Sequence, residues 1–186
     1  MKNSNKSYGV ALAGISASLA LVAIVFARFV EPMTIAFNVL AGIFILLPFT
    51  KGYIVYGLLC YGVVATLSFF ILQLNAFPFI FFFGSYSVVM YLLDFKLAPL
   101  VKNKYLRLSM LVVLKFAFFN LAFFVIYKMM KLVLADINFF GLELKYWMLL
   151  LIGNVLFVAY DFLIRFVFKN MQYLIDKHMP NDRQNS

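Results

Sequence analysis

Three charged side chains stand out inside two long apolar stretches of this chain. Asp161 and Arg165 fall within LIGNVLFVAYDFLIRFVFKN, and Lys115 falls within LVVLKFAFFNLAFFVIY. Even lenient insertion scales put the cost of a charged side chain at the centre of a membrane at about 2.5–3.5 kcal/mol. Each charge is therefore expected to have a partner. An acid in such a place can also carry a proton or contact a solute.

The depth of each group in its helix predicts which groups meet. Lys115 lies eight residues after Arg107, and Asp161 lies eight residues before Lys169. At 1.5 Å per residue, both are roughly 12 Å from the same end of two consecutive antiparallel helices. Lys115 is therefore the first predicted partner of Asp161. Arg165, four residues later on the same face, is the second candidate, but its long side chain can reach cytoplasmic water instead.

Two asparagines are predicted to meet in the same way. The same measure places Asn120 at about 20 Å and Asn154 at about 22 Å. Together with Asn38, these residues form a predicted polar seam: Lys115, Asp161, Asn120, Asn154 and Asn38. Interhelical polar contacts contribute only about 0.6 kcal/mol on average, so the seam either fixes helix register or serves a function.

The composition predicts the elements that carry these residues. Of 186 residues, 66% are hydrophobic and 12% are charged, which is typical of a polytopic membrane protein. Six runs approach the roughly 20 apolar residues of a spanning helix. These runs are 9–27, 33–49, 53–72, 77–95, 107–130 and 146–168. We expect an all-α bundle of about six transmembrane helices over residues 1–168, with a short polar tail over 169–186. Because run 33–49 is short and contains Pro48, a five-span alternative stays open.

The basic residues predict the orientation of these helices. If the N-terminus is cytoplasmic, ten Lys and Arg residues lie on the cytoplasmic side and four on the other. The positive-inside rule then places both termini in the cytoplasm. The Lys and Arg residues that give the chain its net charge of +9 lie mainly at the ends of apolar runs. This placement therefore indicates contact with the headgroups of a cell membrane rather than with nucleic acid.

The first run carries small residues every fourth position. Gly9, Ala13 and Ala17 share one helix face, which would let another helix approach closely. This face either packs within the bundle of the same chain or docks on a second membrane protein.

Catalytic and metal-binding signatures were not found. The single cysteine, Cys60, lies in an apolar run, and the single histidine, His178, lies in the polar tail. The sequence contains no H-E-x-x-H, G-x-S-x-G or P-loop motif. We therefore expect no metal, no cofactor and no enzymatic activity.

Four segments resemble a family of small, uncharacterised polytopic membrane proteins of Firmicutes. They are LLCYGVVATLSFFIL, FFFGSYSVVMYLLD, LVVLKFAFFN and LIGNVLFVAYD, and the resemblance extends from the first run to the sixth. It implies that six residues belong to the family pattern: Lys115, Asn120, Gly153, Asn154, Tyr160 and Asp161. The fourth run departs, because Ser87 and Met90 occupy the region where the family shows a proline and then a lysine.

The architecture also resembles the S components of energy-coupling factor transporters. In those proteins an alanine-rich first helix docks on a membrane coupling subunit, and a vitamin or metal ion binds near the outer face. The resemblance implies a small-molecule ligand and a coupling subunit as partners. We therefore expect a small-solute-binding or transport subunit. The alternatives are a structural or assembly protein, and proton-coupled transport through Asp161.

Overall fold

The computed structural model describes residues 2–133 and 146–178, and within these ranges the chain is helical and has no β-strand. In lipid, a helix satisfies every backbone hydrogen bond within one segment. The elements are α1 Lys2–Phe29, η1 Glu31–Met33, α2 Thr34–Ile45, α3 Leu47–Thr50, α4 Ile54–Leu72, η2 Gln73–Ala76, η3 Phe79–Phe83, α5 Gly84–Tyr91, η4 Leu92–Leu97, η5 Ala98–Leu100, α6 Lys104–Val133 and α7 Tyr146–His178. Four charged residues that bear on the predicted orientation, Asp136, Glu143, Lys145 and Arg183, lie outside the described residues.

Five helical segments are long and apolar enough to cross a membrane. They are Lys6–Phe29, Ile54–Ala76, Phe79–Leu100, Lys104–Met129 and Tyr146–Lys177. These segments correspond to five of the six predicted runs, and their length and composition are those of a multi-pass membrane protein. Helix α7 continues to His178, so the first part of the predicted polar tail is helical.

The remaining run is shorter than the other five and is interrupted near its end. Thr34–Thr50 is a shorter apolar segment, of about 26 Å at 1.5 Å per residue against a hydrocarbon core of about 30 Å. It is interrupted at Leu46, where α2 ends and α3 begins. Pro48 has no N–H to donate to the Phe44 carbonyl, and that oxygen accepts a hydrogen bond from the Ser16 hydroxyl instead.

Helix α2 approaches α5 closely because Gly42 has no side chain. A Cβ at Gly42 would lie 2.7 Å from the Phe83 carbonyl oxygen. The hydroxyl of Ser87 donates to the Gly42 carbonyl at 2.7 Å. This contact anchors α5 to the first half of the chain.

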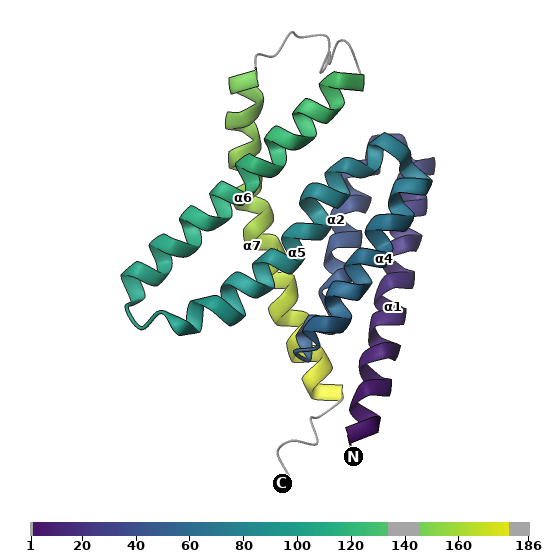
Figure 1. Ribbon diagram of the computed structural model, residues 1–186, viewed down its shortest axis with the longest axis vertical. Helices are drawn as coiled ribbons and strands as arrows, with labels where there is room; N and C mark the ends of the chain where they lie inside the picture. Colours follow the sequence, from purple (N-terminus) through teal and green to yellow (C-terminus); the bar gives the residue numbers. More distant parts are fainter. Residues whose placement is uncertain (1, 134–145, 179–186) are drawn as a thin grey trace.

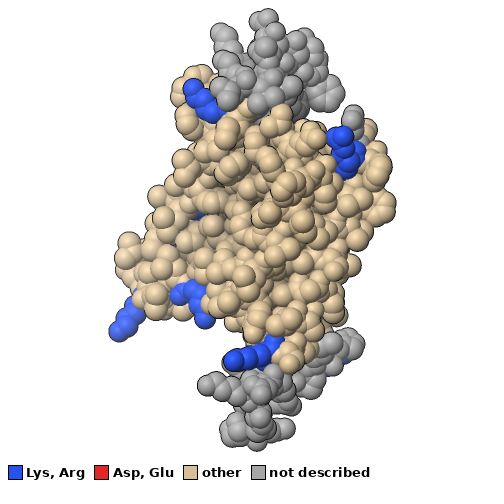
Figure 2. All heavy atoms as spheres, turned by 45° about the vertical axis from the view of Figure 1, so that its right-hand side comes forward, with Lys and Arg blue, Asp and Glu red and all other residues tan. Residues whose placement is uncertain are grey.

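Figure 1 shows α1, α2 and α4 side by side, with α5 leading obliquely from them towards α6 and α7. The start of α1 and the end of α7 lie at the same end of the bundle (Figure 1). In Figure 2, Lys and Arg lie mainly near the two ends of the molecule, and the broad band between them is almost entirely uncharged. We refer to the end that carries Lys51, Lys96, Lys102, Lys104 and Lys169 as the basic end.

Aromatic rings join α6 and α7 to the α5 segment. Phe82 contacts Phe119 at 5.4 Å and Tyr160 at 5.4 Å between ring centroids. Phe119 stacks on Phe157 at 4.8 Å. Aromatic pairs at such distances add about 0.5–1.5 kcal/mol beyond burial. The dense phenylalanines therefore form the packing that brings the polar residues of three helices together.

Candidate functional site

Lys115 is the centre of a cluster of ion pairs inside the bundle. Its ammonium lies 3.0 Å from Asp161 Oδ1 and 2.7 Å from Asp94 Oδ2. The lysine side chain is 5% exposed, and both carboxylates are about 10% exposed. The predicted partners Lys115 and Asp161 thus meet, and the lysine also bridges to a second acid.

Arg165 completes the cluster and corrects one expectation. Its guanidinium forms an ion pair with Asp161 Oδ2, and its Nε lies 3.9 Å from Asp94 Oδ2. Lys115 and Arg165 are therefore not alternatives for Asp161, and Arg165 does not simply turn to water. Its side chain is 47% exposed, so the flexible stem runs along the protein surface while the head reaches inward. We call Asp94, Lys115, Asp161 and Arg165 the ion-pair cluster.

Two members of the site escaped the sequence analysis. Asp94 lies near the end of the fourth apolar run, 77–95, and was not singled out there. An acid inside an otherwise uncharged run was the signal that could have identified it. Tyr86 donates a hydrogen bond to Asp161 Oδ1, but as one of 11 tyrosines it carries no distinctive sequence signal.

The helical geometry of the α5 segment places these two residues. Leu92–Leu97 is a π-helical turn, and Asp94 lies within it. A second π-helical turn, Phe79–Phe83, precedes α5. Such turns re-aim side chains and are frequent at functional sites. One Asp94 oxygen, Oδ1, is buried without a hydrogen-bond partner among the described residues.

Asn120 and Asn154 form a reciprocal amide pair between α6 and α7. Each amide nitrogen donates to the carbonyl oxygen of the other, at 3.4 and 3.3 Å. Each also donates to the carbonyl four residues earlier in its own helix, at 2.7 and 2.8 Å. The predicted pair thus meets, through interhelical bonds longer than the usual 2.9–3.0 Å.

The predicted extension of the polar seam to Asn38 is wrong. Asn38 lies on α2 and is 1% exposed, but its amide nitrogen and oxygen make no hydrogen bond within the described residues. Depth along a helix gives no information about which helix is adjacent. Helix α2 packs mainly against α1 and α5, whereas the amide pair joins α6 and α7.

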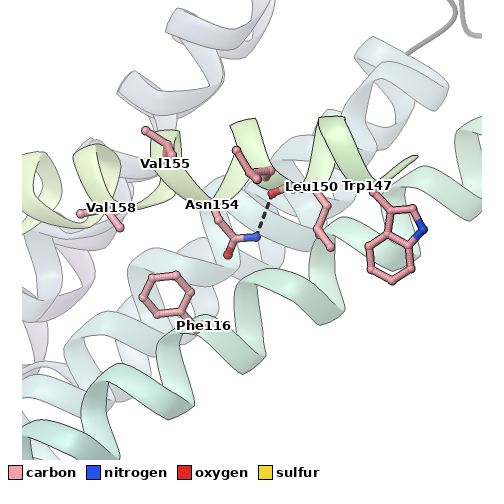
Figure 3. A pocket seen from close by; sticks show the side chains of 7 residues that line it. Phe116, Trp147, Leu150, Asn154, Val155 and Val158 are labelled. Atoms are coloured by element: carbon pink, nitrogen blue, oxygen red, sulfur yellow. Dashed lines mark hydrogen bonds between the residues drawn. The ribbon is translucent and has the colours of Figure 1, made fainter. Parts of the chain in front are cut away.

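An open groove runs along α6 and α7 beside the amide pair. It has a volume of about 570 Å³ and is lined by Phe116, Trp147, Leu150, Leu151, Asn154, Val155 and Val158. Figure 3 shows Trp147 at one end, Val158 at the other and Asn154 between them. Asn154 is the polar side chain of this lining, so the groove offers one amide on apolar walls.

The groove and the ion-pair cluster follow one another along the same helices. Phe116 of the groove directly follows Lys115. Val158 is three residues before Asp161, which is about 4.5 Å along the helix. The cluster therefore lies just beyond the Val158 end of the groove, towards the basic end.

The small residues of α1 pack within this chain. A Cβ at Gly9 would lie 2.7 Å from the Tyr56 ring of α4, and Ala13 and Ala17 pack half-buried against the core. The close approach predicted for this face is therefore made to the chain's own helices. Ala11, Gly14 and Ser18 of α1 are exposed instead, and a Cβ at Gly14 would meet nothing within 4 Å.

The ionisable groups of the site pair with one another, and the neighbouring groove presents one amide. The described residues contain no group of three or more His, Cys, Asp or Glu side chains that could hold a metal ion. The cluster balances two carboxylates with two cations, and the neighbouring groove is open and apolar. No family model matches this chain, nor does any curated protein or solved structure.

Proposed function

We propose that this protein is a non-catalytic subunit of the cell membrane, with both termini in the cytoplasm, that binds a small solute and acts with partner subunits. The observation that carries the proposal is the groove between α6 and α7. Its volume of about 570 Å³ lies within the 300–1,000 Å³ of ordinary ligand pockets. Such pockets have mainly apolar walls with a few polar groups that orient the ligand, as this groove does.

The lining indicates which solutes fit. Apolar walls favour a mainly apolar solute, and Asn154 provides an acceptor oxygen and donor hydrogens. The 3.4 Å bond from Asn120 to the Asn154 oxygen is long, so a solute that donates a hydrogen bond there replaces a weak interaction. We therefore propose a small amphipathic solute with one hydrogen-bond donor directed at Asn154.

Partner subunits are proposed because of a motif that this chain lacks. It contains no nucleotide-binding motif, so a transport cycle driven by ATP would need another subunit. A coupling subunit of the kind used by S components is the proposed partner. The proposed docking face is the exposed side of α1 at Ala11, Gly14 and Ser18, whose small side chains would let another helix approach closely. Gly9 is not available for this contact because it already faces Tyr56.

A structural or assembly role is the alternative, and the ion-pair cluster favours it. Two acids and two cations neutralise one another across the α5 segment, α6 and α7, an arrangement that can simply fix helix register. This alternative predicts that a side chain filling the groove changes nothing, because the groove would then hold only lipid.

The test uses the purified full chain, a panel of vitamins and small amphipathic metabolites, and the shift in melting temperature. Val155→Trp fills the groove from a position that is 65% exposed. Leu156→Trp is the matched control, because Leu156 is 64% exposed and does not line the groove. We expect a panel member to raise the melting temperature of the wild type and of Leu156→Trp, but not of Val155→Trp. If no compound shifts the wild type and no coupling subunit co-purifies, the proposal is wrong.

A further inference from the structure

The turn between the α5 segment and α6 concentrates positive charge. Lys96, Lys102, Lys104 and Arg107 lie within twelve residues, and no acid lies between the first and the last. The three lysines are exposed and Arg107 is half-buried. None of the four makes an ion pair within the part of the chain that the structure describes. We call residues 96–107 the basic turn.

The acids near the basic turn form ion pairs with other cations. Asp94, two residues before the turn, points inward to Lys115 at 2.7 Å. Asp176, also at the basic end, pairs with Lys51 at 2.8 Å. The Lys51 side chain is 4% exposed, so that pair neutralises a buried cation rather than the basic turn. The charge of the turn is thus available to an external anion.

The same turn exposes large apolar side chains. Leu100 is 76% exposed, Tyr105 is 82% exposed and Leu106 is 62% exposed. The backbone between them is held by Asn103, whose Oδ1 accepts hydrogen bonds from the amides of Tyr105 and Leu106 at 3.0 and 3.4 Å. Asn103 therefore caps α6 and fixes the position of the lysines on either side of it.

Cations interleaved with exposed leucine and tyrosine match the boundary between headgroups and acyl chains. Tyrosine is enriched at that depth because its ring is apolar and its hydroxyl is polar. A soluble anion would use only the charges, whereas a lipid uses both the charges and the apolar side chains. In Figure 1 the turn lies at the free outer corner between α5 and α6, away from α1 and α4.

We infer that the basic turn is a binding surface for anionic phospholipids, with Lys96, Lys102 and Lys104 at the phosphates and Leu100 and Tyr105 among the upper acyl carbons. This inference is independent of the α6–α7 groove and of the solute proposed for it. Several basic residues near an anionic leaflet act together, so the turn should prefer an anionic over a zwitterionic lipid by about tenfold or more.

The test places a fluorescent reporter in the turn itself. Tyr105→Trp is made in a Trp147→Phe background, which removes the only other tryptophan of the chain. The full-length protein is reconstituted into phosphatidylcholine vesicles that contain brominated phosphatidylglycerol or brominated phosphatidylcholine. Bromine quenches a tryptophan in contact with the lipid, so the two titrations give the lipid preference at this position.

Lys102→Gln with Lys104→Gln is the test variant. Arg28→Gln with Lys128→Gln is its control, because both of these cations are exposed at the opposite end of the bundle. We expect the titrations to give an affinity for phosphatidylglycerol about tenfold higher than for phosphatidylcholine. This preference should fall at least severalfold in the test variant and stay unchanged in the control. Added salt should weaken it. Glycerol phosphate in solution should not compete. Equal quenching by both lipids, an unchanged preference in the test variant, or displacement by glycerol phosphate would each overturn the inference.

Discussion

Lys115 on α6 and Asp161 on α7 lie 3.0 Å apart inside the bundle, and the same ammonium reaches Asp94 on the α5 segment at 2.7 Å. One lysine therefore forms ion pairs with two buried carboxylates. Arg165 serves them from a position near the surface. This asymmetry between the two cations governs how the cluster should respond to mutation.

Replacing Lys115 should be more harmful than replacing Asp161. Lys115→Met leaves two buried carboxylates with only the half-exposed Arg165 between them, whereas Asp161→Leu leaves Lys115 paired with Asp94. Removing one partner of a buried ion pair costs about 3–5 kcal/mol. We expect Lys115→Met to approach this range and Asp161→Leu to cost clearly less, as measured by thermal denaturation in one detergent. Equal losses would mean that Lys115 does not bridge the two acids.

Combining the two changes should restore part of the stability. In Lys115→Met with Asp161→Leu, the remaining charges are Asp94 and Arg165, whose separation of 3.9 Å is short enough for a direct pair. The double variant should therefore be more stable than the sum of the single losses, with a coupling of about 0.5–3 kcal/mol. Additive losses would show that the two side chains are energetically independent.

Tyr86→Phe tests the third donor to Asp161. Tyr86 is fully buried and its hydroxyl donates to a carboxylate, an interaction worth about 1.5–3 kcal/mol. Tyr61→Phe is the control, because that hydroxyl donates at 2.7 Å to the neutral carbonyl of Ile80. We expect the Tyr86 variant to lose more stability than the Tyr61 variant in the same denaturation assay. The reverse order would contradict the assigned contact.

Gly42→Ala should loosen the contact between α2 and α5. The added methyl group would lie 2.7 Å from the Phe83 carbonyl oxygen, and backbone cannot move aside as a flexible side chain can. Overpacking of this kind costs about 1–3 kcal/mol, which corresponds to a fall of roughly 2–12 °C in melting temperature. Gly14→Ala, whose methyl group meets nothing within 4 Å, should leave the melting temperature unchanged or slightly higher. A stable Gly42→Ala variant would show that the two helices are farther apart.

Sequence reasoning identified the partners wherever depth alone decides the contact. Lys115 with Asp161, and Asn120 with Asn154, lie on the same pair of helices, so equal depth was enough to pair them. Asn38 was wrongly added to that seam because depth says nothing about lateral position. Asp94 was missed because a π-helical turn carries it inward from what looks like the end of a span.

The groove was outside the reach of the sequence. Val155 and Leu156 are adjacent and almost equally exposed, yet only Val155 lines the groove. That difference depends on which side of α7 faces α6, and apolar patterning does not encode this orientation when both side chains are apolar. The sequence also could not show which small residues of α1 face the bundle. Gly9 and Gly14 are both glycines of one apolar helix, but only Gly9 contacts Tyr56.

The most direct test of the proposed function is native mass spectrometry of the full chain, extracted from its own membrane without added ligand. The account predicts a bound molecule lighter than a phospholipid on the wild type and on Leu156→Trp. The same molecule should be absent from Val155→Trp, although that variant folds and inserts normally. No such molecule on the wild type, or equal occupancy in Val155→Trp, would contradict the proposal that the groove between α6 and α7 is a solute-binding site.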